Sequence, residues 1–226
     1  MESVTPSGRA NDLVRRPGAF VVLEGPDGGG KSTQVDLLVK RWRAHGADVY
    51  QTLEPGGTDL GRDIRSLVLH GDAEPMAEAL LMTAQRVQHV AALAPILAGG
   101  TNVVSDRYLP SSLVYQGVGR GLGVETVLSL HQLSGLTLTP DVVLVLDPGD
   151  RSLRDLPDDD RFESAGAVFS QHVRIGYREL ADRFGWQLID ASGSIEEVAE
   201  TIWSIVEPLT VGQTGADRAG RGSHRV

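Results

Sequence analysis

The sequence predicts an α/β fold in which a parallel sheet of about five strands carries helices on both faces. Short apolar runs alternate along the chain with longer segments whose apolar residues recur at helical spacing. Polar motifs directly follow three of the apolar runs, which is where parallel sheets bind their ligands. No internal repeat and no linker interrupts the pattern, so we expect a single domain over residues 18–207.

The first predicted strand, residues 19–23, is wholly apolar and leads into a glycine-rich loop. The next segment, residues 31–45, is predicted to be a helix because its apolar residues form one stripe and Gly46 follows as a stop signal. Residues 48–53 form the second predicted strand.

Helical spacing continues over residues 58–70 and 75–98, and Pro95 predicts a kink or an early end in the second of these helices. Three further strands and two further helices complete the pattern. They are the strands 102–105, 141–146 and 186–190 and the helices 166–184 and 195–206.

The two ends of the chain are predicted to be flexible tails. Residues 1–17 are polar and unpatterned, and residues 208–226 are rich in glycine and arginine. The net charge of −9 argues against a protein that coats nucleic acid or an anionic membrane. We expect no signal peptide and no membrane span, and a chain without cysteine suits a cytoplasmic protein.

A phosphate-binding motif follows the first strand, since residues 25–32, GPDGGGKS, match the pattern G-x-x-x-x-G-K-[ST]. Lys31 would reach the β- and γ-phosphates, and the Ser32 hydroxyl would ligate Mg²⁺. The chain has no N-K-x-D guanine-binding motif, which argues for ATP rather than GTP. The residues assigned to ATP in this loop are Gly25, Pro26, Asp27, Gly28, Gly29, Gly30, Lys31, Ser32 and Thr33.

An acid and an arginine end the third predicted strand. Asp106 lies where a Walker-B acid supports Mg²⁺, so Ser32 and Asp106 form the predicted metal site. Arg107 suits a bidentate contact with a phosphate. The alternative for the Asp106–Arg107 pair is a structural ion pair.

Five stretches in this order, GPDGGGKST, EPGGTDLG, QRVQH, SDRYLPSSLVYQG and DRFE, give the chain a resemblance to bacterial thymidylate kinases, which are P-loop nucleoside monophosphate kinases. The resemblance extends from about Gly18 to Glu207. It implies the P-loop kinase fold, ATP with Mg²⁺ as the phosphate donor, dTMP as the acceptor, direct in-line transfer and a homodimer. Two alternatives stay open: a kinase for another pyrimidine or modified deoxynucleotide, and a nucleotide-binding regulator without turnover.

The resemblance also assigns residues to the acceptor nucleotide. Asp27 would contact the deoxyribose 3′-hydroxyl, which gives a reason for a carboxylate in a phosphate-binding loop, and it would act with Lys31 and Arg107 in catalysis. Arg86 would read the base or its phosphate, and Arg107 would clamp the acceptor phosphate. The other acceptor positions are Glu54, Pro55, Met82, Ser112, Tyr115 and Gln116, although Tyr115 suits a core position equally well.

A lid is expected near residues 149–165. Because residues 25–30 contain no basic side chain, the resemblance implies that a lid arginine covers the transferred group. The candidates are Arg151, Arg154 and Arg161. Ala191, after the last strand, falls on the adenine side, and His89 is expected on the helix surface or in packing.

The chain departs from the family pattern in three places. Leu53 stands where an arginine usually precedes EPGGT, and Met82 stands where a phenylalanine commonly stacks on thymine. The lid is a few residues short. These departures bear on the identity of the acceptor and on which lid arginine acts.

Overall fold

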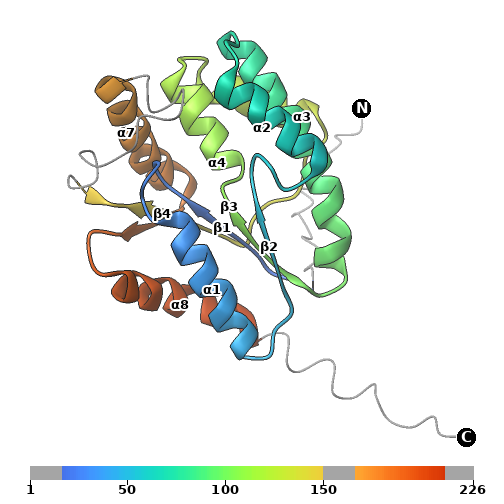
Figure 1. Ribbon diagram of the computed structural model, residues 1–226, viewed down its shortest axis with the longest axis vertical. Coiled ribbons are helices and arrows are strands. Elements are labelled where there is room, and N and C mark those ends of the chain that lie inside the picture. Colours follow the sequence, from blue (N-terminus) through green and yellow to red (C-terminus); the bar gives the residue numbers. More distant parts are fainter. Residues whose placement is uncertain (1–16, 150–165, 212–226) are drawn as a thin grey trace, which may run out of the picture.

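The computed structural model describes residues 17–149 and 166–211. Five strands form one parallel sheet in the order β2-β3-β1-β4-β5, which confirms the predicted fold class (Figure 1). Each strand begins and ends within one residue of its predicted range. The strands are β1 (Phe20–Glu24), β2 (Val49–Leu53), β3 (Asn102–Asp106), β4 (Val142–Asp147) and β5 (Gln187–Asp190).

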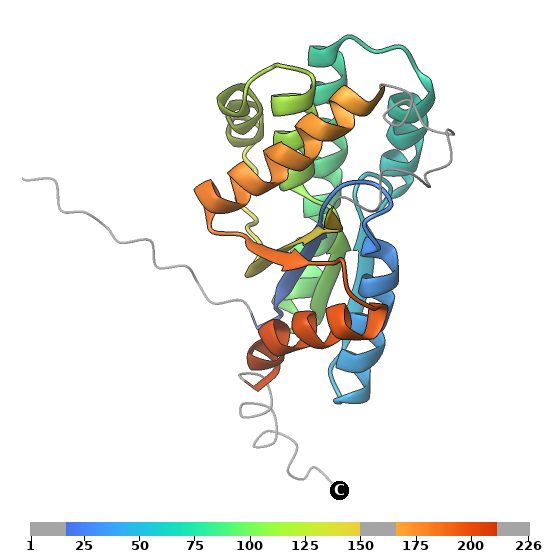
Figure 2. The same cartoon turned by 90° about the vertical axis from the view of Figure 1, so that its left-hand side faces the viewer.

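Helices cover both faces of this sheet (Figures 1 and 2). Helices α1 (Lys31–Ala44) and α8 (Ile195–Val211) lie together against one face. The other face carries α3 (Pro75–Ala98), α5 (Val124–Leu133) and α7 (Gly166–Phe184). Helix α2 (Asp59–His70) packs on α3 and closes the edge above β2.

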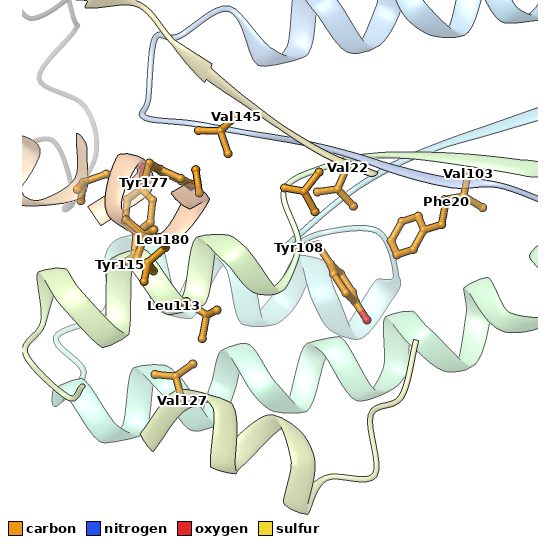
Figure 3. Close-up of a cluster of buried hydrophobic side chains, with 14 of the residues drawn as sticks. Phe20, Val22, Val103, Tyr108, Leu113, Tyr115, Val127, Val145, Tyr177 and Leu180 are labelled. Carbon is orange, nitrogen blue, oxygen red and sulfur yellow. The ribbon is translucent and has the colours of Figure 1, made fainter. Parts of the chain in front are cut away.

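The alternation of side chains along β1 supplies both cores. Phe20 and Val22 point into the cluster under α3, α5 and α7, whereas Val21 and Leu23 point into the cluster under α1 and α8. Figure 3 shows the first cluster, in which Phe20 meets the ring of Tyr108 edge to face. Each fully buried aliphatic side chain of this kind contributes about 1.5–3 kcal/mol, so β1 anchors both layers of the domain.

One helical region was not predicted at all. The chain after β3 forms α4 (Leu109–Ser112), the π-helix η1 (Leu113–Gly119) and α5, whereas the sequence prediction placed no element between the third and fourth strands. Its glycines are residues that commonly end helices, which explains why the sequence pattern did not indicate a helix here. In the structure Gly119 instead allows α7 to approach closely, because a Cβ there would lie 2.6 Å from the Phe169 ring.

Prolines interrupt two helices less than the sequence suggested. Helix α3 continues through Pro95, and the amide of Gly99 still hydrogen-bonds to the Pro95 carbonyl at 2.9 Å. Helix α8 continues through Pro208 to Val211, so residues 208–211 belong to a helix rather than to the predicted tail. Leu209 packs there against the core.

Within residues 17–149 and 166–211, no helix is both long and apolar enough to cross a membrane. The predicted tails over residues 1–16 and 212–226 lie outside the described residues.

Candidate active site

Three loops meet at the carboxyl ends of β1, β2 and β3, as the sequence predicts. Backbone hydrogen bonds fasten them to the neighbouring strands: the amide of Glu54 donates to the Asp106 carbonyl, and the amide of Arg107 donates to the Leu23 carbonyl, each at 2.9 Å. Polar side chains far apart in the sequence are thereby brought to one edge of the sheet.

The phosphate loop leaves the start of α1 open for an anion. Gly30 has a φ of 81° at the helix N-cap, no side chain caps this end, and the first turn contains no acidic residue. Gly25 has a φ of 134°, and a Cβ there would lie 2.4 Å from the carbonyl oxygen of Leu146. The loop can therefore follow β4 this closely only with glycine, and it presents free amides to a phosphate.

Lys31 is buried beneath this loop, where its Nζ donates to the Pro26 carbonyl at 2.7 Å. Burial and the neighbouring Arg107 lower the pKa of Lys31 to about 8, although Asp27, Asp106 and Glu24 act in the opposite direction. A phosphate placed beside the ammonium would favour its charged form. Lys31 is therefore well placed to bind an anion such as a phosphate.

The two predicted metal ligands meet directly. The Ser32 hydroxyl donates to Asp106 Oδ2 at 2.8 Å, although the two residues are 74 positions apart. Among the described residues no group of three or more His, Cys, Asp and Glu side chains could hold a metal ion. Two oxygen donors suit Mg²⁺, which usually takes the rest of its ligands from phosphates and water.

Two cavities adjoin at this edge. We call the first the phosphate cavity, and its own lining residues are Gly28, Gly30, Lys31, Ser32, Thr33, Leu53 and Asp106. We call the second the acceptor cavity, and its own lining residues are Pro55, Val68, Leu69, Met82, Ser111, Tyr115 and Gln116. Four residues line both cavities, namely Asp27, Glu54, Arg65 and Arg107.

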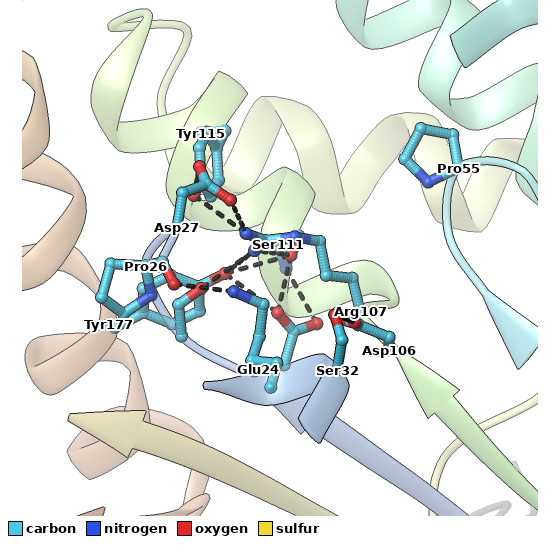
Figure 4. Close-up of polar contacts among 12 residues, drawn as sticks. Glu24, Pro26, Asp27, Ser32, Pro55, Asp106, Arg107, Ser111, Tyr115 and Tyr177 are labelled. Atoms are coloured by element: carbon cyan, nitrogen blue, oxygen red, sulfur yellow. Dashed lines mark hydrogen bonds and ion pairs between the residues drawn. The ribbon is translucent and has the colours of Figure 1, made fainter. Parts of the chain in front are cut away.

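Asp27 lies at the junction of the two cavities. Figure 4 shows its carboxylate beside Arg107 and Tyr115. Its carboxylate forms an ion pair with Arg107 and accepts a hydrogen bond from the Tyr115 hydroxyl at 2.7 Å. Burial alone would raise the pKa of Asp27, but Arg107, Lys31 and the Tyr115 hydroxyl outweigh it and lower the pKa to about 2. Asp27 is therefore ionised at neutral pH.

Arg107 is held from several sides. Its Nη1 donates to the Gly25 carbonyl at 2.9 Å, to Tyr177 at 3.0 Å and to Ser111 at 3.1 Å, while Nη2 contacts Asp27. Its backbone has a φ of 73°, which is the left-handed region that side chains rarely adopt. The backbone strain at Arg107 therefore accompanies a conformation that directs its guanidinium toward the junction of the two cavities.

Arg86 does not line either cavity. Its guanidinium is buried, with Nε 2.9 Å from Glu54 Oε1 and Nη2 2.8 Å from the Ser112 hydroxyl. Burial would raise the pKa of Glu54, but Arg86, together with His89 and the hydrogen bond from Gln85, lowers that pKa below its ordinary value. Arg86 and Ser112 therefore reach the acceptor cavity through Glu54, which lines it.

The loop after β2 is packed tightly against α3. The Glu54–Pro55 peptide bond is cis. A Cβ on Gly57 would lie 2.5 Å from the Thr52 hydroxyl and 2.6 Å from His89 Nε2. Only a glycine at position 57 therefore lets the loop lie this close to Thr52 and His89. His89 is buried, and its Nε2 lies 2.8 Å from the Thr52 hydroxyl, which places it in packing rather than on the helix surface.

The far side of the acceptor cavity is apolar. Met82 is 5% exposed, packs against Ile64 and Val68, and also lines the cavity. Tyr115 is both a core residue and a residue of the site, because its ring belongs to the hydrophobic core while its hydroxyl donates to Asp27. Gln116 lines the same cavity and donates to Glu78 at 2.8 Å.

Ala191, Leu53 and the lid arginines remain of the residues that the sequence singled out. Ala191 follows β5, and its amide donates to the Asp147 carbonyl at 2.8 Å, but it lines neither cavity. Leu53 is 41% exposed and lines the phosphate cavity. The lid candidates Arg151, Arg154 and Arg161 lie outside the described residues.

The sequence reasoning missed two charged residues. Arg65 on α2 lines both cavities, and its Nη1 donates to the Pro55 carbonyl at 3.0 Å. Glu24 ends β1 fully buried and accepts hydrogen bonds from the amides of Tyr108 and Ser111. A carboxylate at the end of an otherwise apolar strand was the signal for Glu24, whereas Arg65 looks like any surface charge on a helix.

A parallel sheet, a glycine-rich phosphate loop at its central strand and a second cavity that opens onto that loop define the class of P-loop kinases. Residues 23–202 match the family model described as thymidylate kinase. The chain therefore belongs to the thymidylate kinase family.

Curated relatives agree with this family. A thymidylate kinase of Synechococcus sp. strain JA-2-3B'a(2-13) is 44% identical over 194 residues, which cover 84% of this chain and 94% of the relative. A thymidylate kinase of Leifsonia xyli subsp. xyli is 44% identical over 200 residues, with the same coverage of 84% and 94%. A thymidylate kinase of Bifidobacterium longum subsp. infantis is 45% identical over 203 residues, which cover 84% of this chain and 84% of the relative.

Proposed function

We propose that this chain transfers the terminal phosphate of ATP to the phosphate of dTMP, giving dTDP and ADP. The single observation that carries the proposal is the junction of the two cavities, where Asp27, Glu54, Arg65 and Arg107 line both. One cavity adjoins the open end of α1 and suits a triphosphate, and the other is apolar on its far side and suits a base. In-line transfer requires the donor and acceptor phosphates to meet at such a junction.

The side chains at this junction supply charge and position. Lys31 and Arg107 would neutralise the two phosphates as they approach each other, which is the main electrostatic obstacle to the reaction. The acceptor phosphate is already an anionic nucleophile, so the reaction needs no general base. Asp27 would accept the sugar hydroxyl of the acceptor, beside Tyr115.

The residues present fit Mg²⁺. Ser32 and Asp106 would hold it, directly or through water, and it would neutralise charge on the donor phosphates. The lid arginines Arg151, Arg154 and Arg161 remain candidates for covering the transferred group. The predicted boundaries of the domain and the cytoplasmic location also remain predictions.

A related kinase with another pyrimidine nucleotide as acceptor is the second candidate, and a specific observation favours it. Met82 lines the base side of the acceptor cavity, where a flexible thioether selects a ring less strictly than an aromatic side chain does.

The test is release of ADP in a coupled assay with dTMP, dUMP, dCMP and dAMP as acceptors. We expect dTMP to give the highest kcat/KM. A higher value for another pyrimidine would favour the second candidate, and no turnover with any of them would leave a nucleotide-binding regulator. The Lys31→Ala protein controls for contaminating kinases.

We also propose that the chain forms a homodimer through α2 and α3. Exposed apolar side chains recur at helical spacing on these two packed helices: Leu60, Leu67, Met76, Leu80 and Val87. Light scattering after size exclusion measures the mass directly. A monomer at micromolar concentration would contradict the dimer, and Leu80→Glu is expected to dissociate it.

A further inference from the structure

The direction in which Arg107 points depends on two hydroxyl groups. Its Nη1 donates to the Ser111 hydroxyl at 3.1 Å and to the Tyr177 hydroxyl at 3.0 Å. A hydroxyl that accepts from an arginine must send its own hydrogen elsewhere. The two oxygens could otherwise face Arg107 with their hydrogens, which would repel the guanidinium.

Glu24 takes both of these hydrogens. Its Oε2 lies 2.6 Å from the Ser111 hydroxyl and 2.9 Å from the Tyr177 hydroxyl, as Figure 4 shows. Its Oε1 accepts the amide of Tyr108 at 2.8 Å and the amide of Ser111 at 3.2 Å. Both oxygens of this fully buried carboxylate are thus occupied by donors from three residues, two of them in the segment after β3 and the third on α7.

Glu24 does this without reaching the substrates, because it lines neither cavity. Burial raises the pKa of Glu24, against the opposing effect of Arg107, so the ionised form depends on these donors and on the guanidinium. An ionised carboxylate is costly to bury, whereas an amide of nearly the same shape would not carry that cost.

We propose that Glu24 is a positioning residue, which turns the hydroxyls of Ser111 and Tyr177 into acceptors for Arg107 and so fixes Arg107 at the junction of the two cavities. This inference rests on the proposed function, in which Arg107 holds the acceptor phosphate. Glu24 acts through Arg107 and does not touch the reacting atoms.

Glu24→Gln tests the proposal because an amide nitrogen cannot accept. If the side-chain NH2 of the introduced glutamine faces the two hydroxyls, it donates to them and turns their hydrogens toward Arg107. If the NH2 faces the backbone amides of Tyr108 and Ser111 instead, donor meets donor and both hydrogen bonds are lost. We expect kcat/KM for dTMP to fall about tenfold or more, which is the usual effect of disturbing hydrogen bonds to a charged group. The KM for ATP should change less than about twofold. Glu125→Gln, a surface exchange of the same chemistry on α5, is the matched control and should leave the constants unchanged.

The decisive readout is the same exchange in an Arg107→Ala background, measured as kcat/KM at high enzyme concentration. If Glu24 acts through Arg107, Glu24→Gln should cost less than about twofold there, since the two effects are not additive. An equal loss in both backgrounds would show a general structural role and overturn the proposal, as would wild-type constants for Glu24→Gln.

Tyr177→Phe repeats the cycle with a milder change and decides the matter if Glu24→Gln does not fold. It removes one of the two hydroxyls and should give a smaller loss that again disappears in the Arg107→Ala background. Turnover of dTMP by the unchanged chain is measured first. Normal turnover together with a silent Glu24→Gln overturns this inference alone, whereas absent turnover overturns the proposed function.

Discussion

Replacing Asp27 by asparagine separates the acceptor side of the site from the donor side. The exchange keeps the shape of the side chain and one oxygen that can accept from the Tyr115 hydroxyl, now 2.7 Å away. It removes the negative charge that pairs with Arg107. Tyr115 lines the acceptor cavity alone, whereas Arg107 lines both cavities. A triphosphate in the phosphate cavity is expected to lose nothing when a nearby carboxylate is removed.

The size of the effect follows from one charge-assisted contact. Such hydrogen bonds contribute about 1.5–3 kcal/mol, or about 10- to 150-fold in affinity. Asp27 is 39% exposed, so solvent weakens the pair and the lower end applies. We expect dTMP to bind about tenfold more weakly and kcat to fall as well, while ATP binds as before or slightly more tightly.

Calorimetric titration of each nucleotide, one at a time, measures both affinities. Asp36→Asn is the matched control, because Asp36 is exposed on α1 and lines neither cavity. Equal weakening for both nucleotides, or weakening for ATP alone, would refute the assignment of Asp27 to the acceptor.

The same variant has a signature in the pH dependence of stability. The pKa of Asp27 in the folded protein, about 2, lies below its ordinary value of 3.8. Its ionic contacts therefore stabilise the fold above pH 3.8 and are lost as the pH falls toward 2. The difference in Tm between the wild type and Asp27→Asn should shrink over that interval, and a constant difference would contradict the depressed pKa.

Three further substitutions test other parts of the site. Lys31→Ala should lower kcat at least about 100-fold, as expected for a lost preorganised charge, and near-normal turnover by a folded variant would exclude the phosphate-loop mechanism. Met82→Phe should lower the KM for dTMP up to about tenfold and sharpen the preference over dUMP, because a ring adds stacking of about 0.5–1.5 kcal/mol; a lower Tm with unchanged preference would instead show overpacking of a core position. Gly57→Ala should raise the KM for dTMP and lower Tm, because its Cβ would collide with Thr52 and His89, and wild-type values of both would contradict the close approach.

The sheet was predictable because short segments rich in apolar residues alternate with helical segments along the chain, most clearly at β1 and β4. The region from Leu109 to Leu133 was not, since its glycines look like helix ends, and the packing of Gly119 against Phe169 on α7 cannot be seen in the local sequence. Pro208 misled for a related reason: a proline near a helix end is tolerated when the following turn packs on the core, as Leu209 does.

The site divides in the same way. Residues carried by contiguous motifs, such as Lys31, Ser32 and Asp106, could be found by their spacing along the chain. Glu24 could not be given a role, because its partners lie 84 to 153 residues away on other elements. Arg86 and Arg65 show that the sequence finds an arginine but not where its side chain lies: the first is buried behind Glu54, and the second lines both cavities.

The two nitrogens of Arg107 explain how one arginine can be fixed and still exchange partners. Nη1 donates to three neutral acceptors of the protein, namely Gly25, Ser111 and Tyr177. Nη2 contacts Asp27, an anion at the junction of the cavities. Nη2 also donates to the Tyr115 hydroxyl at 3.3 Å. Under the proposed function, a phosphate oxygen that reaches Nη2 would compete with Asp27 and Tyr115, and the displaced carboxylate could then accept a hydroxyl of the same nucleotide. The guanidinium would keep its direction during this exchange, because the three Nη1 contacts are made within the protein.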